Sequence, residues 1–150
     1  MKNDSPSMSL KRASGFTLIE VMIAVVIVSI LAAIAIPNYI QYVQVAQRNE
    51  CRAALRGAMG ALERFYVTNS SYTTNLVTGG ANYKTTSGDK TTGGACTLSA
   101  AACGTGIATC VTVTATRAPT GVDPECATYT LDSTNVAGFT GTGDANKCLR

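Results

Sequence analysis

The sequence predicts an α+β protein in which a long N-terminal helix packs on a small, disulfide-linked antiparallel sheet. Three observations lead to this fold class. Residues 16–37 are almost continuously apolar and run into an amphipathic pattern that reaches residue 67, which is typical of one long helix. Two later segments, 109–116 and 127–132, alternate apolar and polar residues as strands do. Six cysteines in 150 residues indicate a small core cross-linked by disulfides.

The composition argues against several classes of function. The formal charge is +3, and much of the surplus comes from Lys2, Lys11 and Arg12. The rest of the chain is near neutral, so its bulk charge gives no indication of specific nucleic-acid binding. The chain has no histidine and no C-x-x-C spacing, and we expect no metal and no cofactor. It also carries no nucleophile elbow, phosphate loop or H-E-x-x-H motif, which leaves a membrane-anchored enzyme as a remote alternative.

The stretch GFTLIEVMIAVVIVSILAAIAIP, residues 15–37, organises the chain. A helix over residues 16–36 would be about 31 Å long, close to the thickness of the hydrocarbon core of a bilayer. Each large aliphatic residue contributes roughly −0.3 to −0.6 kcal/mol to insertion, whereas an acid at the bilayer centre costs about 2.5–3.5 kcal/mol and less near one end. The segment is therefore predicted to span a membrane despite Glu20. An ionisable residue in such a place is a functional hypothesis, with a partner expected.

The residues around this acid match a known pattern. Residues 15–20 read Gly-Phe-Thr-Leu-Ile-Glu, follow a polar leader with Lys11 and Arg12, and precede ILAAIAIPNYIQYVQVAQR. This pattern resembles the N-terminus of the type IV pilin family. The resemblance implies that a prepilin peptidase cuts between Gly15 and Phe16, so that residues 1–15 are a leader peptide, and that the new Phe16 amine is N-methylated. The alternative is an uncleaved membrane anchor.

The resemblance also implies how the helix would be used. In the family, Glu20 of one subunit pairs with the Phe16 amine of a neighbour during assembly, and the helix unwinds near residues 33–37, at Pro37. Residues 16–37 would then be the transmembrane and assembly helix. The implied location is the inner membrane, single-pass with the head in the periplasm, and afterwards the extracellular filament. The implied partners are other pilin subunits, the prepilin peptidase/N-methyltransferase and the inner-membrane assembly machinery.

Residues 38–67 are predicted to form the amphipathic half of the same helix. Its apolar stripe, the face expected to pack on the rest of the domain, comprises Cys51, Leu55, Ala58, Met59, Leu62 and Tyr66. Two glycines, Gly57 and Gly60, each cost about 1 kcal/mol relative to alanine in a helix, so they indicate close packing. The sequence Thr-Asn-Ser-Ser after residue 67 is expected to end the helix.

Residues 68–150 are predicted to form the globular head. The segment 72–106 is rich in Thr, Gly, Ser and Ala and indicates a long loop with at most short strands or turns of helix. Strands are expected at 109–116, with Val111, Val113 and Ala115 on one face, and at 127–132, with Tyr129 and Leu131 on one face. Residues 135–143 are either a loop or a third weak strand.

Six cysteines allow fifteen pairings from sequence alone. The family resemblance implies a disulfide between Cys126 and Cys148, closing what the family calls the D-region, and a loop of that length is worth about 3 kcal/mol in the entropy model. Cys51 faces the domain, and Cys110 is its candidate partner. Strand alternation, however, puts the Cys110 side chain on the other face of the strand from Val111. The remaining candidates for a local loop are Cys96 and Cys103.

Weaker resemblances lie further along the chain. The segments ECRAALRGAMGALERFY, VTVTAT followed by CATYTL, and the closing KCLR resemble minor pilins of the PilE type. The predicted function is therefore a structural subunit of a type IV pilus, a minor pilin that supports motility, adhesion or DNA uptake. A major pilin of the shaft is the first alternative. A type II secretion pseudopilin is another, but its major form is expected to carry an acidic calcium loop and few cysteines, whereas the acids of this head are scattered: Asp123, Glu125, Asp132 and Asp144.

Overall fold

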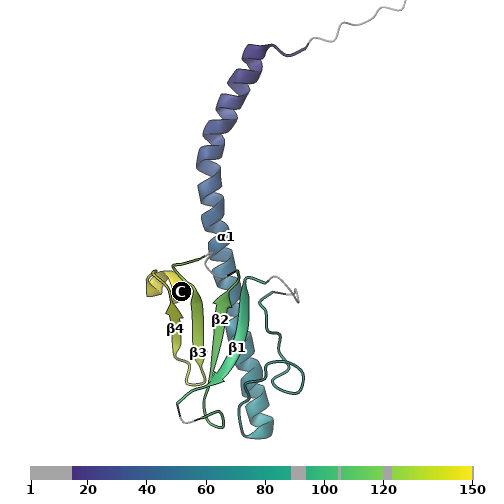
Figure 1. The fold of residues 1–150 in the computed structure, drawn as a ribbon, viewed down its shortest axis with the longest axis vertical. Helices are drawn as coiled ribbons and strands as arrows, with labels where there is room; N and C mark the ends of the chain where they lie inside the picture. The colour runs from purple at the N-terminus through teal and green to yellow at the C-terminus, as the bar shows by residue number, and fades with distance from the viewer. Residues whose placement is uncertain (1–14, 89–93, 105, 120–122, 150) are drawn as a thin grey trace, which may run out of the picture. The chain divides into compact units, whose positions relative to one another are not determined.

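The predicted fold class is confirmed: the chain consists of a long N-terminal helix and a small antiparallel sheet with disulfides (Figure 1). In the computed structural model, the described residues are 15–88, 94–104, 106–119 and 123–149. The elements are α1 (Leu18–Asn69), β1 (Cys96–Ala102), β2 (Val111–Arg117), β3 (Thr128–Asp132), β4 (Ala137–Thr140) and α2 (Ala145–Leu149). The chain divides into two compact units, residues 1–40 and 41–150, and the sheet lies in the second.

Local residues explain where α1 begins and where it ends. The Thr17 hydroxyl accepts a hydrogen bond from the Glu20 backbone N–H at 3.3 Å, as an N-cap threonine does. Ser70, just after the helix, adopts a φ of 54°, the left-handed conformation that commonly terminates helices. Between these ends α1 is continuous through Pro37. Residues 33–37 are therefore helical in the single chain, in contrast to the unwinding that the resemblance implies for a filament.

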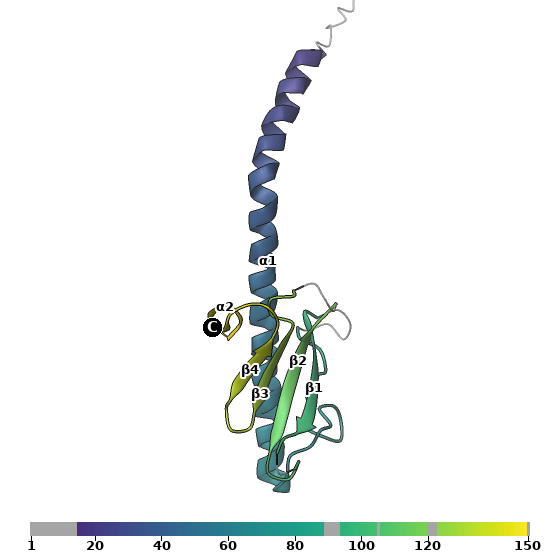
Figure 2. The ribbon, with the colours of Figure 1, turned by 60° about the vertical axis from the view of Figure 1, so that its left-hand side comes forward.

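The four strands form an antiparallel sheet in the order β1-β2-β3-β4 along the C-terminal half of α1, with α2 next to β4 (Figures 1 and 2). Along β2 and β3, buried side chains alternate with partly exposed ones. The inward-facing residues include all five that the alternation predicted: Val111, Val113, Ala115, Tyr129 and Leu131. Strand β4 forms within residues 135–143, where the sequence left a loop or a weak strand open.

Strand β1 corrects the prediction of a long loop over residues 72–106. Its sequence, CTLSAAA, has one β-branched residue and three alanines, so its intrinsic strand propensity is low. It forms because it pairs with the whole of β2, from Cys96 opposite Arg117 to Ala102 opposite Val111. Its Leu98 side chain is also buried. Pairing with a distant segment therefore overrides local propensity here.

The core lies between the sheet and the C-terminal half of α1. Most of the predicted apolar stripe is buried in it: Cys51, Leu55, Ala58, Met59 and Leu62. Tyr66 is the exception, since its side chain is 37% exposed and its ring stacks on Tyr72 with the ring centroids 4.5 Å apart. The stripe thus ends one turn earlier than its periodicity indicates.

The six cysteines form three disulfides. Cys126 is joined to Cys148, the pair that the family resemblance implied. The other candidate pairs were wrong, because Cys51 is joined to Cys96 and Cys103 to Cys110. The unpredicted strand β1 explains both differences. It turns Cys96 inward toward α1, and its register with β2, continued by one pair beyond Ala102, sets Cys103 opposite Cys110.

One of the two helical glycines marks a close approach. A Cβ atom at Gly57 would overlap the hydroxyl of Tyr83, in the loop between α1 and β1, whereas a Cβ at Gly60 would meet only the Arg64 Nη1 atom, at 3.7 Å. The same loop is held by Glu50, whose carboxylate accepts hydrogen bonds from the Ser87 hydroxyl at 2.7 Å and the Ala95 N–H at 3.2 Å. Gly57 therefore lets this loop lie directly on the helix.

This difference predicts unequal stabilities for two matched variants. We expect Gly60→Ala to raise the free energy of unfolding by about 1 kcal/mol, because alanine is the better helix former and nothing obstructs its methyl group. Gly57→Ala gains the same propensity but displaces Tyr83, so it should be less stable than Gly60→Ala. Thermal unfolding of the full chain in mild detergent measures both. An equal rise in melting temperature for the two variants would contradict the close approach at Gly57.

Candidate functional site

The first candidate site is the N-terminal segment of α1, where the sequence places the cleavage and assembly residues. Phe16 is 83% exposed, and the Glu20 side chain is exposed on the same face one turn later. The side chains of this face line an open apolar groove of about 540 Å³: Phe16, Glu20, Val21, Ala24, Val25, Val28 and Ser29. Glu20 is the ionisable side chain among those that line the groove. The Ser29 hydroxyl donates a hydrogen bond to the Val25 carbonyl at 2.7 Å.

The rest of this segment is equally unburied. The large apolar side chains from Leu18 to Ile36 are all more than half exposed. Within the part of the chain that the structure describes, α1 is the one helix long and apolar enough to cross a membrane. Gly15 has no atom of another segment within 4 Å of where its Cβ would be, so the predicted cleavage junction is open.

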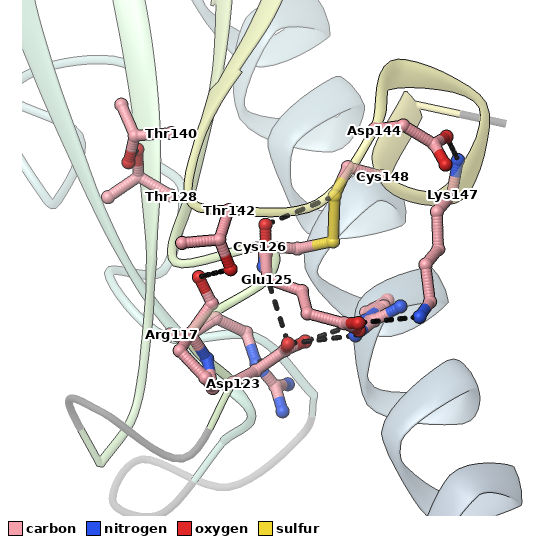
Figure 3. The surroundings of a disulfide bond; sticks show 12 residues. Arg117, Asp123, Glu125, Cys126, Thr128, Thr140, Thr142, Asp144, Lys147 and Cys148 are labelled. Carbon is pink, nitrogen blue, oxygen red and sulfur yellow. Dashed lines mark hydrogen bonds and ion pairs between the residues drawn. A yellow bond between two sulfur atoms is a disulfide. The ribbon is translucent and has the colours of Figure 1, made fainter.

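The second candidate site is the C-terminal loop that the Cys126–Cys148 disulfide closes (Figure 3). Within the loop, the Thr142 N–H donates to the Pro124 carbonyl at 3.0 Å and the Gly143 N–H to the Glu125 carbonyl at 2.9 Å. A side chain at Gly143 would meet that carbonyl and the Cys148 sulfur. The disulfide and these backbone contacts fold the loop closely onto residues 124–126.

A buried ion cluster fixes this loop to α1. Arg48 binds Asp123 through two hydrogen bonds, Nε to Oδ2 at 2.6 Å and Nη2 to Oδ1 at 2.8 Å. The same Nη2 also donates to Glu125 Oε2 at 2.8 Å, and Lys147 Nζ reaches Glu125 Oε1 at 2.7 Å. Arg48 and Asp123 are almost fully buried, while Glu125 and Lys147 lie at the surface. Such a bidentate contact fixes the orientation of the two side chains as well as the distance between them.

A second arginine completes the cluster from β2. Arg117 follows the inward alternation of its strand and is 2% exposed. Its Nη2 donates to Gln47 Oε1 at 2.8 Å, and its Nε lies 3.9 Å from Asp123 Oδ2, an ion pair without a hydrogen bond. Asp123 therefore lies between two buried guanidinium groups, one from α1 and one from the sheet.

The charges of the cluster shift its pKa values in consistent directions. Burial alone would raise the pKa of Asp123, but the hydrogen bonds and charge of Arg48, the Cys126 N–H and the charge of Arg117 outweigh it and hold that pKa below its ordinary value. The hydrogen bond to Asp123 likewise raises the pKa of Arg48. The ammonium group of Lys147 and then Arg48 lower the pKa of Glu125. Arg48, Asp123 and Glu125 therefore stay charged at neutral pH.

The cluster borders a polar groove of about 470 Å³, which also includes Gln41, Gln44 and Val45 of α1. Its charged groups are already paired with one another, so the arrangement suits recognition by shape and hydrogen bonds better than proton transfer. Among the described residues, no group of three or more His, Cys, Asp or Glu side chains is placed to hold a metal ion.

Sequence reasoning missed this cluster. It treated Asp123 and Glu125 as scattered acids, although the fold brings both to Arg48, which lies 75 positions before Asp123. One signal was available, since Arg48 lies three residues before Cys51 and seven before Leu55, on the stripe that faces the core. A cation on a buried face needs an anionic partner, although the sequence alone does not identify which acid provides it.

The cluster predicts the effect of removing its central charge. Asp123→Asn leaves Arg48 and Arg117 buried without their anion, so we expect a loss of about 3–5 kcal/mol in the free energy of unfolding. Urea unfolding of the full chain in mild detergent at neutral pH gives the value. Glu63→Gln removes an exposed acid from α1 and is the matched control, expected to change little. A loss below about 1 kcal/mol in the Asp123 variant would contradict a structural role.

The same variant predicts a pH effect with a definite sign. Because the folded pKa of Asp123 lies below its unfolded value, its contribution is complete above the unfolded value, about 3.9, and is lost as the pH falls through the folded pKa. Wild type should therefore lose stability in that acidic range more steeply than Asp123→Asn. Glu125 also has a lowered pKa, so some pH dependence should remain in the variant.

Two family models match the chain. Residues 37–137 match the model of a family described as "Type IV minor pilin ComP, DNA uptake sequence receptor", and residues 10–36 match the prokaryotic N-terminal methylation motif. The chain is 43% identical over 61 residues to the type IV major pilin protein PilA of Myxococcus xanthus, which covers 41% of this chain and 28% of that protein. It is 39% identical over 66 residues to the type IV wide pilus major component PilA4 of Thermus thermophilus, covering 44% and 50%.

A type II secretion relative shows a similar likeness. The type II secretion system core protein G of Klebsiella pneumoniae is 35% identical over 65 residues, covering 43% of this chain and 46% of that protein. The chain thus spans half or less of the length of the three relatives named here. The minor-pilin model, in contrast, covers more than half of the chain and most of its head. The chain therefore belongs to the type IV pilin family, and within it to the ComP-type minor pilins.

Proposed function

We propose that this chain is a minor subunit of a type IV pilus. The subunit is first anchored in the inner membrane by α1 and then packs into the filament through the same helix. The observation that carries the proposal is the apolar, unburied N-terminal segment of α1 with its single acid, Glu20. In the membrane, lipid covers this segment, and the head lies in the periplasm. In the filament, the helices of other pilin subunits take the place of the lipid.

Processing prepares the segment for this use. The match to the methylation motif supports cleavage between Gly15 and Phe16 by a prepilin peptidase and methylation of the new amine. That amine and Glu20 are four residues apart, so they lie on one face of the helix. The N-cap bond from Glu20 N–H to Thr17 is made by residues that cleavage retains.

The acid sets the register of assembly. A carboxylate in lipid needs a counter-charge, and in a bundle of helices the Phe16 amine of a neighbour supplies it. Such a pair adds little stability compared with an apolar contact, but it selects one alignment among many that an apolar surface permits. Pro37, which lacks an N–H, marks the place where α1 can unwind when the helices pack.

The relatives keep two alternatives open, a major pilin and a type II secretion pseudopilin. The match of the minor-pilin model across residues 37–137 favours the minor pilin, because it includes the head, where these classes differ. Among the described residues, the acids of the head do not gather into a possible cation site, as an acidic calcium loop would require.

We further propose that the head takes part in DNA uptake by contacting DNA. The specific support is the match to a family described as a DNA uptake sequence receptor. Motility and adhesion remain other processes that a pilus containing this subunit would serve.

Cleavage is tested at its junction. We expect the mature chain to begin at Phe16, with its amine methylated, and the Gly15→Val variant to keep its leader because the peptidase requires the small residue. Intact-mass spectrometry of the membrane-extracted chain distinguishes the two forms. Normal processing of the Gly15 variant would argue strongly against a prepilin peptidase.

The register role is tested with Glu20→Val. Removing the acid makes insertion easier, by no more than about 3 kcal/mol, so a loss of assembly cannot come from failure to insert. We expect the variant to reach the membrane and to form its head disulfides but to enter filaments poorly. Quantitative mass spectrometry of sheared pili measures its incorporation against wild type.

Methylation is the confounding factor in this experiment, so the state of the Phe16 amine is read in the same sample. Ser29→Val, at the other end of the same groove, is the control, because it removes a polar group already bonded within its own helix. Incorporation of the Glu20 variant at the wild-type level would show that the acid does not set the register.

A further inference from the structure

We propose that Arg52 and Arg56 of α1 form a phosphate-binding pair through which the head holds the backbone of DNA. This inference rests on the proposed contact with DNA and identifies the surface that makes it. The two arginines lie one turn apart on the same face of α1, so their Cβ atoms are about 5–6 Å apart. Arg52 is half-buried and Arg56 is exposed.

The choice follows from where the other cations of the head are used. Arg48 and Arg117 are buried around Asp123, and Lys147 is paired with Glu125. Lys84 donates to the Gly88 carbonyl. Among the described residues of the compact unit 41–150, three basic side chains have no acidic partner: Arg52, Arg56 and Arg64. These are the groups that can accept a phosphate without breaking an existing ion pair.

Two of the three arginines share a pocket. Arg52 and Arg56 line a small hollow of about 40 Å³, and its other walls are residues of β3 and β4 and Leu149 of α2. Gly138 of β4 also lines the hollow, and a Cβ atom there would meet the Thr130 hydroxyl at 2.7 Å. Its size suits a single small group such as a phosphate, and it is too small for a base. Arg64 lies three turns after Arg52 and does not line this pocket.

The chemistry of the pair matches a DNA backbone. A guanidinium group binds phosphate through two parallel hydrogen bonds, which lysine cannot do. Phosphate charges recur about every 3.4 Å of helix axis along one strand, so one phosphate can enter the hollow while the next lies beside the exposed Arg56. The remaining hydrogen bond of Arg52, to the Asn49 side chain, joins neutral and charged groups and leaves the cation unneutralised.

The other surfaces are less suitable. The outward side chains of β2 and β3 are mainly hydroxyls, such as Thr112, Thr114, Thr116 and Thr128, together with the acid Asp132. They offer neutral hydrogen bonds but no cation. The closest acid in sequence on the face of the pair is Glu63, about 10 Å along the helix from Arg56, near the screening length at ~0.1 M salt. Repulsion between the Glu63 carboxylate and a phosphate bound by the pair is therefore weak at this salt concentration.

The test compares two variants that each remove one positive charge from α1, Arg56→Gln and Arg64→Gln. The mature full chain in neutral-detergent micelles is titrated into a short fluorescein-labelled DNA duplex, and binding is followed by anisotropy over a range of potassium chloride concentrations. We expect Arg56→Gln to weaken binding roughly tenfold and to reduce the slope of log K against log salt by about 1. Arg64→Gln should leave both values unchanged, and the Arg52→Gln/Arg56→Gln variant should reduce the slope by about 2.

A second duplex of different sequence completes the design, because a phosphate contact should lose the same factor on both. Equal losses in Arg56→Gln and Arg64→Gln would show that net charge, not the pair, attracts DNA. Wild-type binding that survives in the double variant would overturn the site and leave the DNA contact standing. No binding by wild type would overturn both. Normal DNA binding by the double variant with exclusion from sheared pili would assign the pair to an acidic surface of another subunit.

Discussion

The C-terminal half of the head depends on the contact between Arg48 and Asp123. It joins residues 75 positions apart through two hydrogen bonds, and both side chains are almost fully buried. A buried ion pair is not intrinsically more stable than an apolar contact of the same volume, but breaking one side of it is costly. Its contribution is therefore to position. The loop that Cys126 and Cys148 close upon itself is set against α1 by this pair, and Arg117 adds a constraint from the sheet.

The N-terminal segment of α1 is under the opposite constraint. Its apolar side chains from Leu18 to Ile36 are not buried by other described residues of the chain, so this segment needs contact with either lipid or other helices. An evenly apolar surface does not distinguish one alignment of helices from another. Glu20 does, because in lipid it is unfavourable and in a bundle it can meet a charge of opposite sign. Under the proposed function, the same residue would favour transfer from membrane to filament and select the register of packing.

The sequence predicted those parts of the fold whose signals are local. The period of α1, the alternation in β2 and β3 and the breaker after Val67 each indicated their element, and the cleavage motif identified the family. Strand β1 was missed because CTLSAAA becomes a strand only by pairing with β2, and two disulfides were wrong because that pairing sets Cys96 and Cys103. The ion cluster was missed for the same reason: the sequence shows Arg48 on a buried face but not which distant acid meets it.

Net charge does not show how the charges of this chain are distributed. Asp123 and Glu125 neutralise Arg48 and Lys147, whereas, within the described residues, Arg52 and Arg56 have no acidic partner. A low net charge lets a subunit pack closely beside others without self-repulsion, whereas a local pair of cations still attracts phosphate. Because phosphate contacts carry no sequence information, such a pair would hold DNA in place without selecting it. Preference for one sequence must then come from neutral side chains that hydrogen-bond to base edges, which a count of charges does not reveal.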